Sequence, residues 1–215
     1  MQLNGFDLGL LQGAIETIRE QPETGTVTIR TLHRWADGFG VDGYAKEVEE
    51  GGDVTARRFT FRTDWPLEIG GRDSGPSPGE ALLGALGGCV AMTYIVKAAG
   101  RAVTIDELEV TIEARVNLQG AFELDSVRAG LSDVTVTVGV RSDADDAVLD
   151  ELAQTTSRTS AVFDSMANAV SMRLLVQRLT GRSNAPASRR PVCSENSQSA
   201  WAPTTSSASQ PSVGS

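Results

Sequence analysis

Cys89 is the side chain of this sequence with the greatest potential for nucleophilic chemistry. It lies in the middle of a strongly apolar segment, and a thiol in that setting is either inert core filler or a reactive site. Reactivity requires a pKa below the ordinary range of a thiol and an opening to solvent, because the thiolate is the nucleophile. The interior of a helix gives little dipole assistance, so we expect a nearby cation to lower the pKa of a reactive Cys89.

Few other residues are candidates for chemistry. The second cysteine, Cys193, lies in a Ser- and Pro-rich stretch, and two cysteines do not make a disulfide scaffold. The single histidine, His33, follows Leu32 on an expected strand, and a lone histidine of this kind more often has a structural role. Because the sequence contains no cluster of Cys and His, we predict no metal site and no cofactor.

The segment that positions Cys89 is expected to be a long buried helix. A turn, Gly75-Pro76-Ser77-Pro78, opens it, and the helix should run from about Pro78 to Ala98. Three glycines lie inside it: Gly84, Gly87 and Gly88. Each costs about 1 kcal/mol relative to Ala, and close approach of another backbone is the best reason for them. A helix that is apolar almost all round needs cover on more than one side, so we predict an obligate homodimer.

Hydrophobic periodicity predicts the remaining elements. We expect an amphipathic helix over 6–20, a second long helix over 143–154 capped by Asp143, and strands over 26–32, 44–48, 58–62, 108–116, 134–140 and 172–176. Strands joined mostly by hairpin-length connections favour an α+β fold with antiparallel sheets. We divide the chain into an N-terminal amphipathic helix at 1–24, one α+β domain at 25–180, and a disordered Ser/Pro-rich tail at 181–215.

Charge and hydropathy exclude several classes of function. The formal net charge is -9, and such a surface repels phosphate backbones, so we expect no nucleic-acid partner. The longest apolar run, around 81–92, is too short for a membrane span. No basic region followed by an apolar block begins the chain, so we predict no signal peptide and a cytoplasmic location.

Several motifs resemble those of one known family. These are the Gly75-Pro76-Ser77-Pro78 turn with its Leu/Ala/Gly-rich helix and central Cys89, Thr63-Asp64-Trp65-Pro66 with Gly70-Gly71-Arg72-Asp73, and Ser160-Ala161-Val162-Phe163-Asp164. Over roughly 25–178 the chain is similar to the osmotically inducible protein C (OsmC) family, which includes the organic hydroperoxide resistance proteins. The resemblance implies an intertwined homodimer with central helices packed between sheets and active sites at the subunit interface. It also implies that Cys89 attacks the O–O bond of a hydroperoxide and becomes a sulfenic acid.

The chain departs from the peroxidase pattern of that family at three places. Ser160 stands where those members carry a second cysteine, so the disulfide of that pattern cannot form there. Cys193 is the only other thiol and would have to reach Cys89 from the tail; otherwise an external thiol reduces the enzyme, or peroxidase turnover has been lost. Glu80 comes one residue later than the family's glutamate, and nine residues from Cys89, which favours a first-turn carboxylate that stabilises the helix. The expected hairpin turn at 37–41 lacks the family's arginine, and the possible substitutes are Arg34, Arg57 and Arg58.

The resemblance implies one leading function and leaves alternatives open. The leading function is thiol-dependent reduction of organic hydroperoxides, with Cys89 as the catalytic residue and with Ser160 and Phe163 in the binding site. The expected partners are a second copy of the chain, a small hydroperoxide or apolar ligand, and an external thiol reductant. The alternatives are a non-catalytic protein that binds a small apolar ligand, and a protein whose thiol senses oxidation without turnover.

Overall fold

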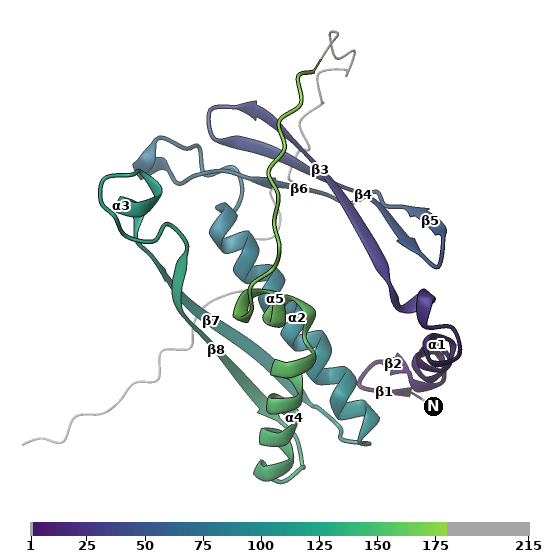
Figure 1. Ribbon diagram of the computed structural model, residues 1–215. Helices are drawn as coiled ribbons and strands as arrows, with labels where there is room; N and C mark the ends of the chain where they lie inside the picture. The colour runs from purple at the N-terminus through teal and green to yellow at the C-terminus, as the bar shows by residue number, and fades with distance from the viewer. Residues whose placement is uncertain (1, 180–215) are drawn as a thin grey trace, which may run out of the picture. The chain divides into compact units, whose positions relative to one another are not determined.

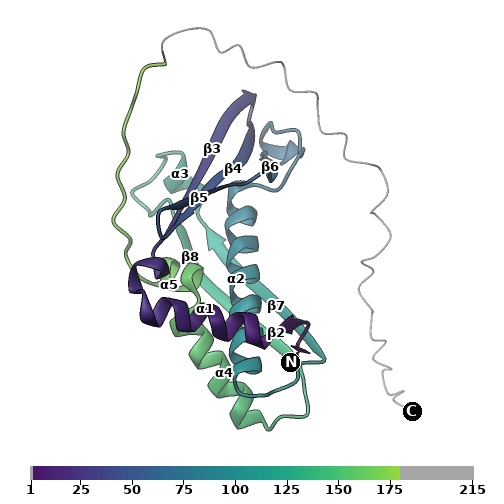
Figure 2. The same ribbon diagram turned by 90° about the vertical axis from the view of Figure 1, so that its right-hand side faces the viewer.

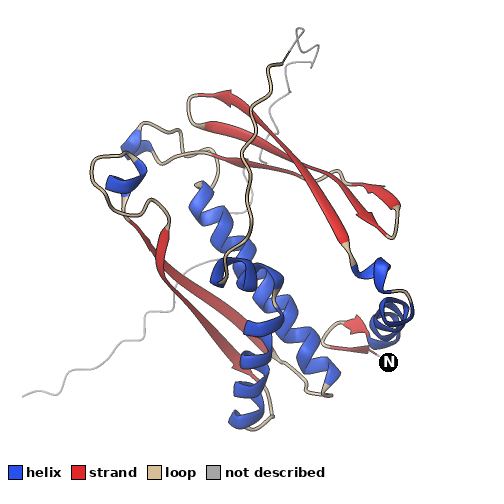
Figure 3. Ribbon diagram, viewed as in Figure 1, coloured by secondary structure: helices blue, strands red, loops and turns tan. Residues whose placement is uncertain are grey.

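A computed structural model describes residues 2–179 and confirms an α+β fold with antiparallel strands (Figure 1; Figure 3). In chain order the elements are β1 (Gln2–Leu3), β2 (Phe6–Asp7), α1 (Leu8–Glu20), a 3-10 turn (Pro22–Gly25), β3 (Val27–Asp37), β4 (Gly40–Glu50), β5 (Asp53–Ala56), β6 (Thr60–Thr63), a second 3-10 turn (Leu67–Ile69), α2 (Pro78–Gly100), β7 (Glu107–Val116), α3 (Leu118–Ala121), β8 (Leu131–Arg141), α4 (Asp146–Thr159) and α5 (Ala161–Ala167).

The first large sheet is built around β4. This strand pairs antiparallel with β3 on one side and with β5 and β6 on the other. The β3–β4 turn contains Gly38, whose positive φ of 53° suits a residue without a side chain. Sequence periodicity found β3, β4 and β6 but missed β5, whose four residues are too few for a clear pattern and are all exposed.

Helix α2 begins at the proline-gated turn, as expected. Ser77 is its N-cap, and the Ser77 side chain accepts a hydrogen bond from the backbone N–H of Glu80 at 3.3 Å. The Glu80 carboxylate in return accepts from the Ser77 backbone N–H at 2.7 Å, which completes a capping box. These hydrogen bonds with Ser77 hold the pKa of Glu80 below its ordinary value. The interpretation of Glu80 as a helix-stabilising carboxylate is therefore confirmed.

The core lies between the second half of α2, helix α4 and the β7–β8 pair (Figure 2). Tyr94, Ala98 and Leu152 are its fully buried members. The Tyr94 hydroxyl donates a hydrogen bond to the Leu149 carbonyl at 3.1 Å, so the polar end of this buried ring has a partner. Alternation along β7 half-buries its apolar side chains, as the sequence predicted, and Leu108 packs against this core; the alternating residues are Leu108, Val110, Ile112 and Ala114.

The glycines of α2 have a different environment from the one we expected. A Cβ atom built on Gly84 or Gly88 would meet nothing within 4 Å, and one on Gly87 would meet only the side chain of Ile112, at 3.4 Å. Within the described chain, therefore, no backbone closely approaches these glycines. Leu82 and Met92 on the same helix are also exposed, so part of the apolar surface of α2 has no cover from this chain.

Two other expectations are wrong in detail. The helix predicted at 143–154 begins at Asp146 after an N-cap at Asp145, not Asp143, and continues to Thr159. The strand predicted at 172–176 does not form: these residues have no regular structure, and Leu174 is 94% exposed. This segment belongs to a unit separate from 1–171, and no strand pairing among the described residues includes it.

The predicted tail at 181–215, including Cys193, lies outside the described residues, and the predicted domain boundaries stay a prediction. Among residues 2–179, α2 is the one helix whose length and hydropathy would suffice to cross a membrane. That is weak evidence for a span, because the core helix of a soluble protein passes the same test.

Candidate functional site

The structure brings Cys89 and Ser160 together from positions 71 residues apart. The Ser160 hydroxyl donates a hydrogen bond to the Cys89 sulfur, with an Oγ–Sγ distance of 3.2 Å. Cys89 is half-buried on α2, whereas Ser160 is 0% exposed between α4 and α5. Ser160 is also the N-cap residue of α5, yet its side chain makes no capping hydrogen bond. Its hydroxyl therefore serves the sulfur rather than the helix.

Hydrogen-bond donors around Cys89 let its thiol lose a proton more easily than the thiol of an ordinary cysteine. Burial by itself raises the pKa of Cys89, but hydrogen bonds from the Ser160 hydroxyl, the Val162 backbone, the Thr93 hydroxyl and the Ala161 backbone outweigh it and lower the pKa. Donors that favour the charged form act in this direction. The expectation that a cation would lower this pKa is wrong: the Thr93 hydroxyl on α2 and the hydroxyl and backbone amides at the start of α5 do so instead.

A second hydroxyl near this site has no partner. Thr156 is buried, and its Oγ1 is the single buried side-chain oxygen or nitrogen among the described residues that makes no hydrogen bond. Thr156 precedes Ser160 by four residues, one helical turn, so the two lie on the same face of this end of α4. Buried hydroxyls are normally satisfied, so this end of α4 has capacity for a further polar contact.

Of the other residues considered from the sequence, Phe163 lies near Cys89, whereas the histidine and the arginines make contacts elsewhere. Phe163 is half-buried on α5, the helix that packs on α2 beside Cys89. His33 contacts the edge of the Phe61 ring at 5.4 Å between centroids and lies on β3, which agrees with a structural role. Arg34 and Arg57 stack on Tyr44 and Phe59 respectively, and neither forms an ion pair with any described residue.

Two arginines near the β3–β4 turn are occupied by carboxylates. Arg62 donates to Asp42 at 2.7 Å, and Arg72 pairs with Asp37 at the end of β3. No hydrogen bond or ion pair among the described residues joins any arginine to Cys89. Arg72, whose string Gly70-Gly71-Arg72-Asp73 belongs to the turn before α2, contacts Asp37 and not the sulfur.

Sequence reasoning missed the importance of Asp64, which organises the turn before α2. Its side chain is 1% exposed and accepts hydrogen bonds from the Ser74 hydroxyl at 2.6 Å and from the Trp65 backbone at 2.8 Å. The hydrogen bond from Ser74 is the main reason that the pKa of Asp64 is lowered. In the same turn, a Cβ on Gly71 would lie 1.7 Å from the Trp65 carbonyl oxygen, so only glycine fits. Asp64 and Gly71 both lie in the sequence motifs between Thr63 and Asp73, and the structure gives these motifs a structural role in the turn before α2.

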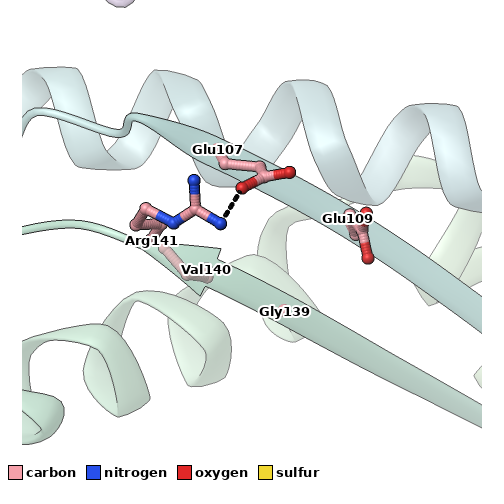
Figure 4. A pocket seen from close by; sticks show the side chains of 5 residues that line it. All are labelled: Glu107, Glu109, Gly139, Val140 and Arg141. Atoms are coloured by element: carbon pink, nitrogen blue, oxygen red, sulfur yellow. Dashed lines mark ion pairs between the residues drawn. The ribbon is translucent and has the colours of Figure 1, made fainter. Parts of the chain in front are cut away.

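A shallow pocket at the ends of β7 and β8 is a weaker candidate (Figure 4). It is lined by Glu107, Glu109, Gly139, Val140 and Arg141. Arg141 forms an ion pair with Glu107 across the two strands, so the one cation of this pocket is already neutralised. Among residues 2–179, no group of three or more Cys, His, Asp or Glu side chains is placed to hold a metal ion.

Comparisons with known proteins point to one family. A family model described as OsmC-like protein matches residues 71–174. Among solved structures, the chain is similar to an OsmC-like protein from Mycoplasma pneumoniae, with a TM-score of 0.53 and 14% identity over 66% of this chain and 89% of that one. It is also similar to an organic hydroperoxide resistance protein from Legionella pneumophila, with a TM-score of 0.44 and 12% identity over 65% of this chain and 88% of that one. No curated protein matches the sequence. At such identity the likeness to the Mycoplasma structure establishes the fold alone.

Proposed function

Residues 71–174 belong to the family of OsmC-like proteins, and from that premise we propose that this chain reduces organic hydroperoxides at Cys89. The observation that carries the proposal is the set of donors around the sulfur, with Ser160 at 3.2 Å. A thiol whose pKa is lowered and which keeps partial exposure meets the two requirements for a reactive cysteine.

The proposed reaction is an attack of the Cys89 thiolate on the terminal oxygen of the hydroperoxide. An S–O bond forms as the O–O bond breaks, so the sulfur is oxidised by two electrons to a sulfenic acid. The alkoxide that leaves takes a proton from solvent and becomes an alcohol. The open hydrogen-bonding capacity of Thr156, one turn from Ser160, supports a polar substrate group at this end of α4.

Regeneration of Cys89 requires an external thiol in this proposal, because Ser160 cannot form a disulfide. One thiol molecule condenses with the sulfenic acid, which releases water and leaves a mixed disulfide. A second thiol molecule attacks that disulfide, so that Cys89 returns to its reduced form and the external thiol leaves as a symmetrical disulfide.

We also propose that the functional unit is a homodimer. The open side of Gly84 and Gly88 and the exposed Leu82 and Met92 leave apolar surface of α2 uncovered in one chain. A second copy is the simplest cover for such a surface.

The test is consumption of cumene hydroperoxide with an excess of a small dithiol. The wild type should turn over, and a sulfenic acid should be trapped with dimedone when the dithiol is left out. Cys89→Ser should abolish both signals, whereas Cys193→Ser should change neither. A wild type that consumes the peroxide no faster than Cys89→Ser would overturn the proposal.

A companion variant tests the site's geometry. Ser160→Cys would put a second thiol where the hydroxyl now contacts the Cys89 sulfur. Peroxide treatment of this variant should then give an intramolecular disulfide and little dimedone adduct, measured by mass spectrometry of peptides. Persistence of the dimedone adduct at the wild-type level would mean that the two side chains are not in contact in solution.

One observation favours the alternative of a sensing or binding protein. No cation among residues 2–179 of this chain contacts Cys89, so none of these residues offers a positive charge to the leaving alkoxide. If Cys89 forms a sulfenic acid once but does not turn over with excess dithiol, the redox-sensing function is preferred.

A further inference from the structure

A groove in the β3–β6 sheet gathers four cationic side chains on a protein that is acidic overall. The groove has a volume of about 420 Å³. Its cationic lining residues are Arg34 from β3, Lys46 from β4, and Arg57 and Arg58 from the segment between β5 and β6. The whole chain has 28 acidic and 19 Lys and Arg residues, so a local excess of positive charge opposes the general composition.

None of these four cations forms an ion pair with a described residue. The one acidic residue that lines the groove, Glu47, pairs with Arg30 at 3.3 Å, and Asp42 on the same strand pairs with Arg62 at 2.7 Å. The groove therefore differs from the pocket between β7 and β8, where the cation has an acidic partner. Positive charges left unmatched in a hollow attract anions and raise their local concentration.

Two of the guanidinium groups are held in place by aromatic rings. Arg34 lies 5.8 Å from the centroid of the Tyr44 ring, and Arg57 lies 4.9 Å from that of the Phe59 ring. An arginine stacked by its face keeps its N–H edge free, and that edge matches the oxygens of a phosphate in a two-pronged hydrogen bond. Arg34 and Arg57 thus each present a pair of guanidinium N–H groups in the same groove.

Irregular strand pairing creates the groove. Arg30 pairs with Glu47 and Thr31 with Ala45, so Lys46 is an extra residue in β4. On the other side of β4, Ala56 pairs with Glu47 and Thr60 with Tyr44, so residues 57–59 oppose only two residues. Bulges of this kind re-aim side chains and are frequent beside functional sites. Here they bring the Arg57–Phe59 segment against Lys46.

We propose that this groove binds a small organic molecule that carries two adjacent phosphate groups. Two stacked guanidinium groups can each take one phosphate, while Lys46 and Arg58 neutralise the remaining charge. The volume is sufficient for a small ligand, and the walls formed by Tyr44, Phe59 and Leu32 supply apolar contact for its organic part. The proposal is independent of the chemistry at Cys89, because no residue of the groove contacts that sulfur.

Isothermal titration calorimetry of the full chain with inorganic pyrophosphate tests the proposal. We expect saturable binding of one pyrophosphate per chain that weakens as salt is added. Arg34→Gln combined with Arg57→Gln should weaken binding at least about tenfold, because each removes a charge-assisted fork. Lys46→Gln, which leaves the stacked pairs intact, should weaken it less.

Arg115→Gln is the matched control, because Arg115 is an exposed arginine on β7 with no described ion pair. It should bind pyrophosphate as the wild type does. Absence of saturable binding by the wild type at millimolar pyrophosphate would overturn the proposal, and so would equal weakening by Arg115→Gln. Citrate or a short single-stranded DNA that binds more tightly than pyrophosphate, with the same loss in the double variant, would overturn the assignment to a small diphosphate.

Discussion

The two larger sheets of this protein differ in how their apolar side chains are covered. Along β7 and β8 the alternating side chains pack under α2 and α4, around the fully buried Leu152 and Tyr94. Along β3–β6 no hydrophobic side chain is buried, and Ile29 is 72% exposed. One part of the chain therefore completes a core by itself, whereas the other presents surface. The two proposals concern different regions: Cys89 lies on α2 in the region with the buried core, and the basic groove lies in the exposed β3–β6 sheet.

The largest expected effect is on stability and compares one residue from each part. Leu152→Ala should cost about 2–5 kcal/mol of unfolding free energy, because it removes a fully buried side chain and leaves a cavity. Ile29→Ala, the matched control on β3, should cost less than about 1 kcal/mol. Urea denaturation followed by circular dichroism measures both. Equal costs would show that the open sheet is covered in solution and would break the comparison.

The next effect, of about 1 kcal/mol, concerns the open side of α2. In an isolated chain Gly88→Ala should stabilise the helix by about that amount, because a Cβ there meets nothing within 4 Å. In the proposed homodimer the same change inserts a methyl group between subunits, so we expect weaker association and a lower melting temperature. Gly79→Ala, at the start of the same helix, is the control. Light scattering measures the association, and thermal melts at several concentrations show whether Gly88→Ala raises or lowers the melting temperature. A clear stabilisation by Gly88→Ala would contradict the dimer.

The smallest effect tests whether the start of α2 is stabilised locally. Glu80→Gln should cost about 0.5 kcal/mol at neutral pH, through loss of a carboxylate at a helix N-terminus. The folded-state pKa of Glu80 is lowered from the ordinary 4.5, so its contribution is present above that value and disappears as the pH falls through the folded-state pKa. The difference between wild type and variant in denaturant melts should therefore shrink below pH 4.5. A difference that persists in acid would exclude a charge effect.

Elements with strong local signals could be predicted from the sequence, and elements defined by tertiary contact could not. Helix α2 and strand β7 have a capped start and a regular alternation, and both were found within a few residues. Helix α5 has only seven residues, too few for a periodic pattern, and it is defined by its packing on α2. The predicted strand at 172–176 has the right residue types but no partner in the described chain, which sequence alone cannot reveal.

The same limit applies to the candidate site. The resemblance to the OsmC family suggested that Ser160 and Cys89 occupy corresponding site positions, but no spacing rule placed them in contact. The expectation of a cation beside Cys89 was wrong because it was based only on the position of the thiol within its own helix, α2. Apart from the Thr93 hydroxyl on α2, the donors come from the junction of α4 and α5, whose existence depends on the fold.

The position of Ser160 has a consequence for mutational tolerance. As the first residue before α5, it could be replaced by Asp or Asn with no loss to the helix, since both are excellent N-caps. Its hydroxyl, however, is committed to a neighbouring sulfur in a space with 0% exposure. A carboxylate there would face the thiolate as a like charge and suppress its formation. We therefore expect the amino acids tolerated at this position to be limited by the Cys89 sulfur rather than by the helix that Ser160 precedes.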